Sequence, residues 1–205
     1  MITLNVKADF NRVIARLRAQ GKAVELAQVS ALNKAADQSR TQMQRAITST
    51  YNLSASFVRE RLSVTRARRN GQFTYTAALV GSDRKPSMNL IHFAANVSGK
   101  EKAAWRKQVS KSGRLYAPNI PFAIKKGKGR VYVKGAFIGN SGRTVFMREG
   151  KERLPIKPVQ TITVEGMFRS RKNTGDVMAW LRTNLPRIFE SELKFYMDRA
   201  ATKGY

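Results

Sequence analysis

The side chains that could do chemistry are few in this sequence, and their spacing fits no catalytic centre. The single histidine, His92, lies in the apolar run Leu90–Phe93 and lacks the partners that a triad or a histidine-based metal site needs. A lone histidine in such surroundings is typical of a hydrogen-bonded structural residue. The segment Gly139–Arg143 lacks the Gly-x-Ser-x-Gly spacing, and no Gly-x-x-x-x-Gly-Lys-Ser/Thr loop is present for nucleotide phosphates.

The acidic residues are too scattered for metal-assisted hydrolysis. A two-metal nuclease needs several convergent carboxylates, whereas the 13 Asp and Glu residues are spread along the chain. Glu149 and Lys151 resemble the end of one nuclease motif, but no partner aspartate is evident. Gly127-Lys128-Gly129 could hold an anion through backbone N–H groups, although a lone Gly-x-Gly is a weak signal. The sequence therefore predicts a protein that is not an enzyme and needs no cofactor.

The charge balance is the strongest functional signal. The 205 residues include 39 Lys and Arg against 13 Asp and Glu, which gives a net charge of +26. Such a charge favours anionic partners, meaning nucleic acid, an acidic protein surface or anionic lipid. There are no cysteines, and no apolar run approaches the roughly 20 residues that span a bilayer. The first 18 residues do not resemble a signal peptide, so we expect synthesis in a cytoplasm and no membrane partner.

A basic arm is expected between Ser98 and Lys134. This segment contains one acid, Glu101, and interspersed glycines and prolines. Its eleven basic residues are Lys100, Lys102, Arg106, Lys107, Lys111, Arg114, Lys125, Lys126, Lys128, Arg130 and Lys134. The composition predicts a long hairpin or arm whose tip is disordered or ordered by a partner. It would contact an anion or a neighbouring subunit; the alternative is an exposed loop without a dedicated partner.

A second basic group follows the first long helix. Its members, which are candidates to face DNA, are Arg59, Arg61, Arg66, Arg68 and Arg69. Tyr116, Phe122 and Tyr132 lie near the basic arm and could stack on bases, although their alternation with Ile and Val fits burial in a sheet equally well. A general nucleic-acid-binding module is therefore an alternative function, but no recognition helix or RNA-binding signature is present.

The periodicity predicts an α+β fold with an antiparallel sheet. Helical spacing predicts a short helix after Asp9 that ends at Gly21, and a longer one over about 22–50, whose small residues could pack on the chain's own sheet or on a neighbouring copy. Ser54 is a plausible cap for a further short helix. Alternation on either side of Asn70-Gly71 predicts a β-hairpin.

The second half is expected to contain more strands and a C-terminal helix. Residues 134–156 fit two strands joined by a turn at Asn140-Ser141-Gly142, and Val159, Ile162 and Val164 continue the alternation. Residues 169–175 are expected to be a polar linker. The C-terminal helix should begin near Asp176 and be interrupted or restarted at Pro186.

Three stretches carry a resemblance to a known family. The first is Ala31-Leu32-Asn33-Lys34-Ala35, followed by Phe57–Arg61 and Arg66-Ala67. The second stretch is the most specific and comprises Gly135, Ala136, Phe137 and Ile138, then Gly142-Arg143, Val145–Met147, Arg148, Gly150, Lys151, Arg153, Pro155 and Ile156. The third is Leu185-Pro186, which opens a basic helix. With these stretches in order over most of its length, the chain resembles the prophage minor tail protein Z family, the tail completion proteins of lambda-like long-tailed phages.

The resemblance implies a structural role in a virion. Such proteins act late in assembly at the head-proximal end of the tail, at the neck or head–tail junction. It implies a ring of identical copies, six to match the tail symmetry, beside a tail terminator ring, the tail tube and the head–neck connector. Genomic DNA would pass through the channel. Under this interpretation, the arm of residues 98–134 reaches a neighbouring subunit or acidic ring.

Overall fold

The alanine-rich segment that begins at Gly21 forms helix α2 (Gly21–Thr50), as its pattern predicts. The structure is a computed structural model that describes residues 2–6, 21–69, 75–81, 88–94, 115–116, 122–133, 135–150 and 152–203. The helix expected after Asp9 lies outside these residues. Gly21 was expected to end that helix, but it is the first residue of α2.

Two units are distinguished by contacts within the chain. The first comprises residues 1–47, 55–82 and 164–205, and the second comprises residues 48–54 and 83–163. Both contain helical and strand residues, so the α+β fold class is confirmed. The segment 98–134 belongs to the second unit. That the whole chain works as one domain with this segment inserted stays a prediction.

The first unit contains an antiparallel sheet in the order β1-β3-β2, with strands β1 (Ile2–Val6), β2 (Leu62–Arg69) and β3 (Tyr75–Gly81). The pairing of β2 with β3 confirms the predicted hairpin. Thr65 pairs with Ala78 and Arg68 with Thr76, so the register shifts between these two pairs. Such a bulge bends and twists the strand locally. It places the arginine-rich end of β2 in a different register from its apolar start.

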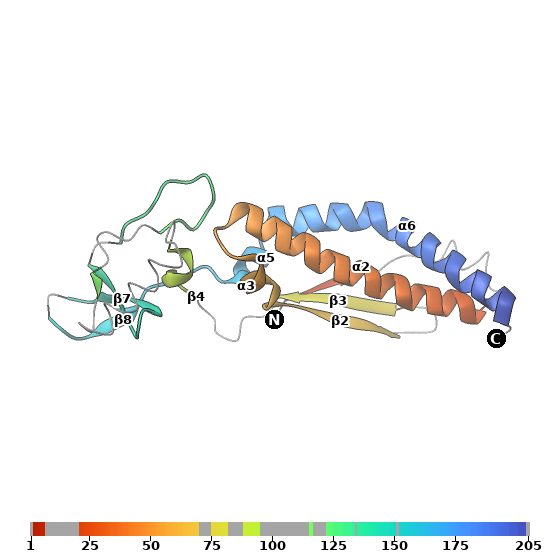
Figure 1. The fold of residues 1–205 in the computed structure, drawn as a ribbon, viewed down its shortest axis with the longest axis horizontal. Coiled ribbons are helices and arrows are strands. Elements are labelled where there is room, and N and C mark those ends of the chain that lie inside the picture. Colours follow the sequence, from red (N-terminus) through yellow and green to blue (C-terminus); the bar gives the residue numbers. More distant parts are fainter. Residues whose placement is uncertain are drawn as a thin grey trace. The chain divides into compact units, whose positions relative to one another are not determined.

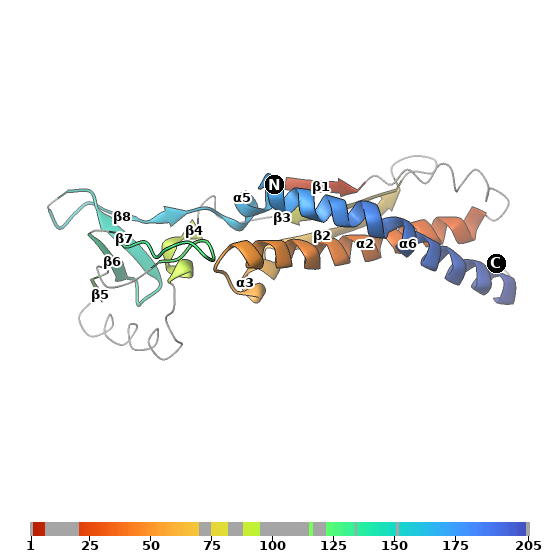
Figure 2. The same cartoon turned by 90° about the horizontal axis from the view of Figure 1, so that it is seen from above.

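Two long helices cover one face of this sheet. Figures 1 and 2 show α2 and α6 (Arg171–Lys203) lying over the strands and running in opposite directions. The small face of α2 packs within the chain itself, because Leu32, Ala35, Ala36, Met43 and Ile47 are all buried. On α6, Phe189 is buried with Ala27 and Ala31 of α2. Alanines at these positions leave room for the large ring.

Polar side chains also join the helices to each other and to the sheet. Glu192 of α6 is 6% exposed, and its carboxylate accepts hydrogen bonds from Ser30 Oγ at 2.6 Å and from Lys34 Nζ. On the sheet side, the Tyr75 hydroxyl donates to Glu25 of α2. Burial, the hydrogen bond to Glu25 and the charge of Glu25 raise the pKa of Tyr75 to about 12. These contacts fix how α2 lies between α6 and β3.

The C-terminal helix differs from the prediction at its start and at its proline. Residues 171–175, expected to be part of a linker, form its first turns, preceded by the short helix α5 (Val164–Phe168). Asn173 Nδ2 donates to the Met167 carbonyl at 2.8 Å, and Thr174 Oγ1 donates to the Phe168 carbonyl at 2.7 Å. These bonds satisfy carbonyls at the end of α5 and so join the two helices. The helix continues through Pro186, which is exposed; one missing backbone N–H is outweighed by the packing on both sides.

The second unit holds two small antiparallel sheets. The larger has the order β5-β6-β7-β8, with β5 (Leu115–Tyr116), β6 (Ala136–Gly139), β7 (Thr144–Arg148) and β8 (Ile156–Pro158). The smaller pairs β4 (Met88–Asn89) with β9 (Gln160–Thr161). A 3₁₀ helix, η2 (Leu90–Phe93), follows β4. Residues 88–93 therefore form a short strand and a helical turn. The run Val159–Val164 does not form one strand, because Val164 begins α5.

The pairing of β6 with β7 confirms the predicted two strands and turn. The turn residues Asn140, Ser141 and Gly142 have φ values of 51°, 51° and 78°, so all three adopt the left-handed region that Asn and Gly tolerate best. Phe137 and Phe146 pair across the strands and stack with ring centroids 5.8 Å apart. A Cβ at Gly139 would lie 3.2 Å from the Phe146 ring, a tight contact that the ring could relieve only by shifting a few tenths of an ångström.

A basic hairpin as candidate anion-binding site

Residues 122–133 of the expected arm form a narrow hairpin. Phe122 and Val131 pair antiparallel and exchange two backbone hydrogen bonds, of 2.9 Å from Phe122 N and 2.8 Å from Val131 N. The Phe122 side chain is fully buried. A buried aromatic ring at the base and paired backbone groups define the hairpin without any contribution from its charged tip.

Backbone hydrogen bonds join the first half of the hairpin, residues 122–126, to two other segments of the second unit. Ala123 N donates to the Phe93 carbonyl at 3.0 Å. Asn52 N donates to the Ile124 carbonyl at 3.0 Å, and Lys126 N donates to the Thr50 carbonyl at 2.9 Å. The turn beyond them closes with Gly127 at φ 72°. This part of the arm thus has a defined conformation within the chain itself, whereas a tip ordered only by a partner was expected.

The tip of the hairpin presents cations to solvent. Lys125, Lys126, Lys128 and Arg130 are exposed, as are Gly127 and Gly129 between them. The Lys125 Nζ lies 6.0 Å from the centroid of the Tyr51 ring, a distant cation–π contact. No acidic residue in the described parts of the chain forms an ion pair with these four. Their charge is therefore available to an external anion.

The aromatic residues near the arm divide between core and surface. Phe122 is buried, so the suggestion that it stacks on bases is wrong. Tyr132 is 54% exposed beside Val131, which is 55% exposed, so the Tyr132 ring is accessible. Tyr116 lies in β5, paired with Phe137. The remaining basic candidates of the arm fall outside the described residues: Lys100, Lys102, Arg106, Lys107, Lys111, Arg114 and Lys134.

The arginines proposed to face DNA are largely engaged within the first unit. Arg61 lies over the Phe57 ring, 3.5 Å from its centroid, and its Nη1 donates to the Phe57 carbonyl at 3.1 Å. Arg69 Nη1 lies 3.9 Å from the Glu25 carboxylate. Arg59 and Arg68 are exposed. The group does not form one free cationic surface, although its members remain near solvent.

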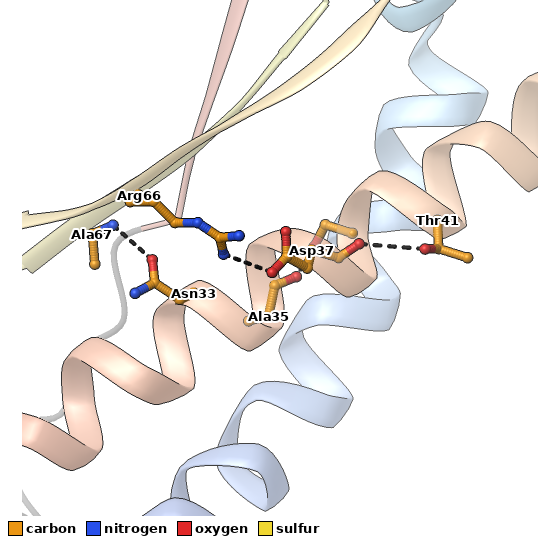
Figure 3. A network of polar contacts seen from close by, with 7 residues as sticks. Asn33, Ala35, Asp37, Thr41, Arg66 and Ala67 are labelled. Carbon is orange, nitrogen blue, oxygen red and sulfur yellow. Dashed lines mark hydrogen bonds and ion pairs between the residues drawn. The ribbon is translucent and has the colours of Figure 1, made fainter. Parts of the chain in front are cut away.

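Arg66 is the clearest case of an arginine used within the fold. Its Nη1 lies 2.6 Å from Asp37 Oδ2, and the next residue, Ala67, donates its backbone N–H to Asn33 Oδ1 at 2.8 Å. Figure 3 shows the Arg66 side chain extending from β2 toward Asp37 on α2, with Asn33 one turn earlier on the same helix. The two contacts attach β2 at its bulge to α2. Arg66 therefore has a structural partner that its sequence neighbourhood did not reveal.

The second of the three stretches that carry the family resemblance forms part of the larger sheet of the second unit. Ala136, Phe137 and Ile138 are buried in β6, and Gly135 precedes them with φ 73°. Arg148 in β7 lies 5.9 Å from the centroid of the Phe137 ring. Gly150, Arg153 and Pro155 are exposed in the β7–β8 connection, and Lys151 lies outside the described residues. The β6 residues of this stretch therefore pack in the core of the second unit, whereas its last residues lie at the surface.

The structure also identifies residues that the sequence reasoning did not single out. Asn89 bonds to the backbone of Val145, and Glu192 is buried between α2 and α6. A polar residue in an otherwise apolar helical stripe could have signalled Glu192, whereas nothing local distinguishes Asn89. In the described ranges, no helix is long and apolar enough to cross a membrane. Within those ranges there is also no cluster of three or more potential metal ligands.

Comparison with known proteins gives one match. The family model described as Prophage minor tail protein Z (GPZ) matches residues 11–203, which is nearly the whole chain. Searches of curated proteins and of solved structures found no match. The matched range includes the basic hairpin, the second unit and the first unit except for residues 1–10 and 204–205.

Proposed function

Because the chain belongs to the prophage minor tail protein Z family, we propose that it is a structural protein that completes the head-proximal end of the tail of a long-tailed bacteriophage. Membership of a phage minor tail protein family supports a structural role in the tail. In the finer proposal, six identical copies form a ring at the head–tail junction. The ring contacts the tail terminator, the tail tube and the head–neck connector, and genomic DNA passes through its channel.

One observation carries this proposal: the family match extends from residue 11 to residue 203. The geometry of the first unit is compatible with it. Three of its acids, Glu25, Asp37 and Glu192, are partnered by side chains from other elements, so they hold helices and strands together. Such contacts between elements suit a structural role.

Imaging of intact particles tests the proposal. Phage particles that encode this chain would be examined by cryo-electron microscopy, and the structure of the first unit would be fitted into density where the tail meets the head. We expect a sixfold ring there, and we expect tails made without the chain to lack it and to form non-infectious particles. Density elsewhere, or intact infectious particles without the chain, would contradict the proposal.

A further inference from the structure

We propose that the hairpin of residues 122–133 binds nucleic acid through its phosphate backbone. In this assignment Lys125, Lys126, Lys128 and Arg130 contact phosphates of duplex DNA without reading its sequence. The inference rests on the proposed function for the presence of DNA beside the protein, but the binding itself can be measured on the isolated chain.

The first argument is that the four cations are presented by a preformed structure. Backbone bonds at Phe122, Ala123, Ile124 and Lys126 hold the hairpin, so the tip need not fold when an anion binds. Ion pairs to described acids do not compete for the four side chains. Because less ordering is required, more of the electrostatic attraction appears as affinity.

The second argument concerns the class of partner. The tip from Lys125 to Arg130 is six consecutive exposed residues, four basic and two glycine, without an apolar residue at its centre. Protein–protein interfaces have apolar or aromatic centres and are depleted in lysine, whereas phosphate backbones are bound mainly by Lys, Arg and backbone N–H groups. The composition of the tip therefore favours nucleic acid over an acidic protein surface. The exposed Val131 and Tyr132 follow the tip and lie at the base of the hairpin, where Val131 pairs with Phe122.

The bare backbone of the tip strengthens this argument. At Gly127 and Gly129, no atom lies within 4 Å of the position that a Cβ would take. The turn therefore has open space at these two positions, where a phosphate can approach its backbone. Two of the β2 arginines differ in this respect, since Arg66 pairs with Asp37 and Arg69 lies near Glu25.

Self-repulsion in the proposed ring gives a third argument. Each copy carries +26 charges, so identical copies repel one another at close range. A polyanion bound to each copy would neutralise part of this charge. The hairpins supply a local site at which the phosphates of one nucleic-acid strand could neutralise this charge.

The test is salt-dependent binding of the full chain to a fluorescein-labelled 20-base-pair duplex of arbitrary sequence, followed by anisotropy. The variant replaces Lys125, Lys126, Lys128 and Arg130 with Gln. Each phosphate contact contributes about 0.9 to the slope of log K against log salt concentration. We expect the slope of the variant to be shallower by about 3 to 4, and its affinity at about 0.15 M salt to fall at least about tenfold.

A matched control separates a local site from general positive charge. It replaces the same number of exposed basic residues on α6, namely Lys172, Arg182, Arg187 and Lys194, with Gln. Gln is a good helix former, so the helix should be retained. We expect the slope of the control to change by less than about 1. A third variant, with Lys125, Lys126 and Lys128 replaced by Arg, keeps the charge and should bind like the original chain.

The outcomes decide between the hairpin, the whole surface and a protein partner. Equal losses in the hairpin and control variants would overturn the proposal, because net charge alone would then explain binding. Unchanged DNA binding with failed incorporation into tails would also overturn it and would indicate a protein partner. Absence of the original chain from particles would contradict the proposed function, while a selective loss of DNA binding would still support the hairpin site.

Discussion

The side-chain amide of Asn89 bonds both backbone groups of Val145. Its Nδ2 donates to the Val145 carbonyl at 3.1 Å, and its Oδ1 accepts from the Val145 N–H at 2.8 Å. The same Oδ1 accepts from Ile91 N at 3.1 Å and caps η2. Val145 is fully buried. The amide of Asn89 thus bonds like a peptide group, beside Val159 N, which also donates to the Val145 carbonyl at 2.8 Å, and it joins β4 and η2 to β7.

Replacing Asn89 with Ala should destabilise the second unit. The buried N–H of Val145 would lose this acceptor, which costs about 1–3 kcal/mol. Hydrogen exchange of the Val145 amide should become about 10- to 100-fold faster, since 1.4 kcal/mol corresponds to a factor of ten. The control is Gln160→Ala, which removes an exposed amide at the position paired with Asn89. Equal effects of the two substitutions would contradict the assigned role.

Glu192 should make the first unit sensitive to acid. Burial alone would raise the pKa of its carboxyl, but hydrogen bonds from Lys34 and Ser30 and the charge of Lys34 outweigh it, so the pKa lies below its ordinary value. A carboxyl whose pKa is lowered by folding stabilises the protein above its unfolded pKa, and this contribution disappears as the pH falls through the folded pKa. The loss of stability should therefore begin below about pH 4.3, the ordinary pKa of a glutamate.

The matching experiment compares Glu192→Gln with the original chain by urea unfolding over a range of pH. At pH 7 the variant should be less stable by about 1.5–3 kcal/mol, the range for hydrogen bonds to charged groups. The difference should shrink as the pH falls below about 4. Asp198→Asn on the exposed side of α6 is the control and should show no such trend. A difference independent of pH would mean that Glu192 is not charged in the folded protein.

Gly127 and Gly129 should respond differently to alanine. At φ 72°, a Cβ at residue 127 strains the backbone, which costs about 1–2 kcal/mol, whereas Gly129 has open space and no such φ. Exchange of the Lys126 amide, bonded to the Thr50 carbonyl, should therefore be about tenfold faster in Gly127→Ala and nearly unchanged in Gly129→Ala. Similar exchange rates in both variants would show that the left-handed turn does not hold the hairpin.

The ion pair between Arg66 and Asp37 should contribute little to stability. The two side chains are 62% and 48% exposed, so water screens their attraction. A double-mutant cycle with Arg66→Ala and Asp37→Ala should give a coupling energy of about 0.2–1 kcal/mol that decreases in high salt. A coupling well above this range would show that the pair is more protected than its exposure indicates.

Much of the local structure could be predicted from the sequence, because it depends on short-range patterns. Helical spacing of small apolar residues predicted α2, alternation around Asn70-Gly71 predicted the pairing of β2 and β3, and Asn140-Ser141-Gly142 predicted the β6–β7 turn. The same rules failed at the C-terminal helix. Pro186 and Gly175 are locally unfavourable within a helix, but packing on α2 outweighs their cost.

The composition by itself determined that anionic partners are favoured, since a net charge of +26 does not depend on the fold. Only the tertiary structure decided which cations are available to them. Arg66 meets Asp37 from a helix 29 positions earlier in the chain, and Arg69 lies near Glu25 of the same helix. The lysines of the 122–133 hairpin have no such neighbour among the described acids. Pairing of a charge depends on distance in space, which residue types and spacing along the chain do not specify.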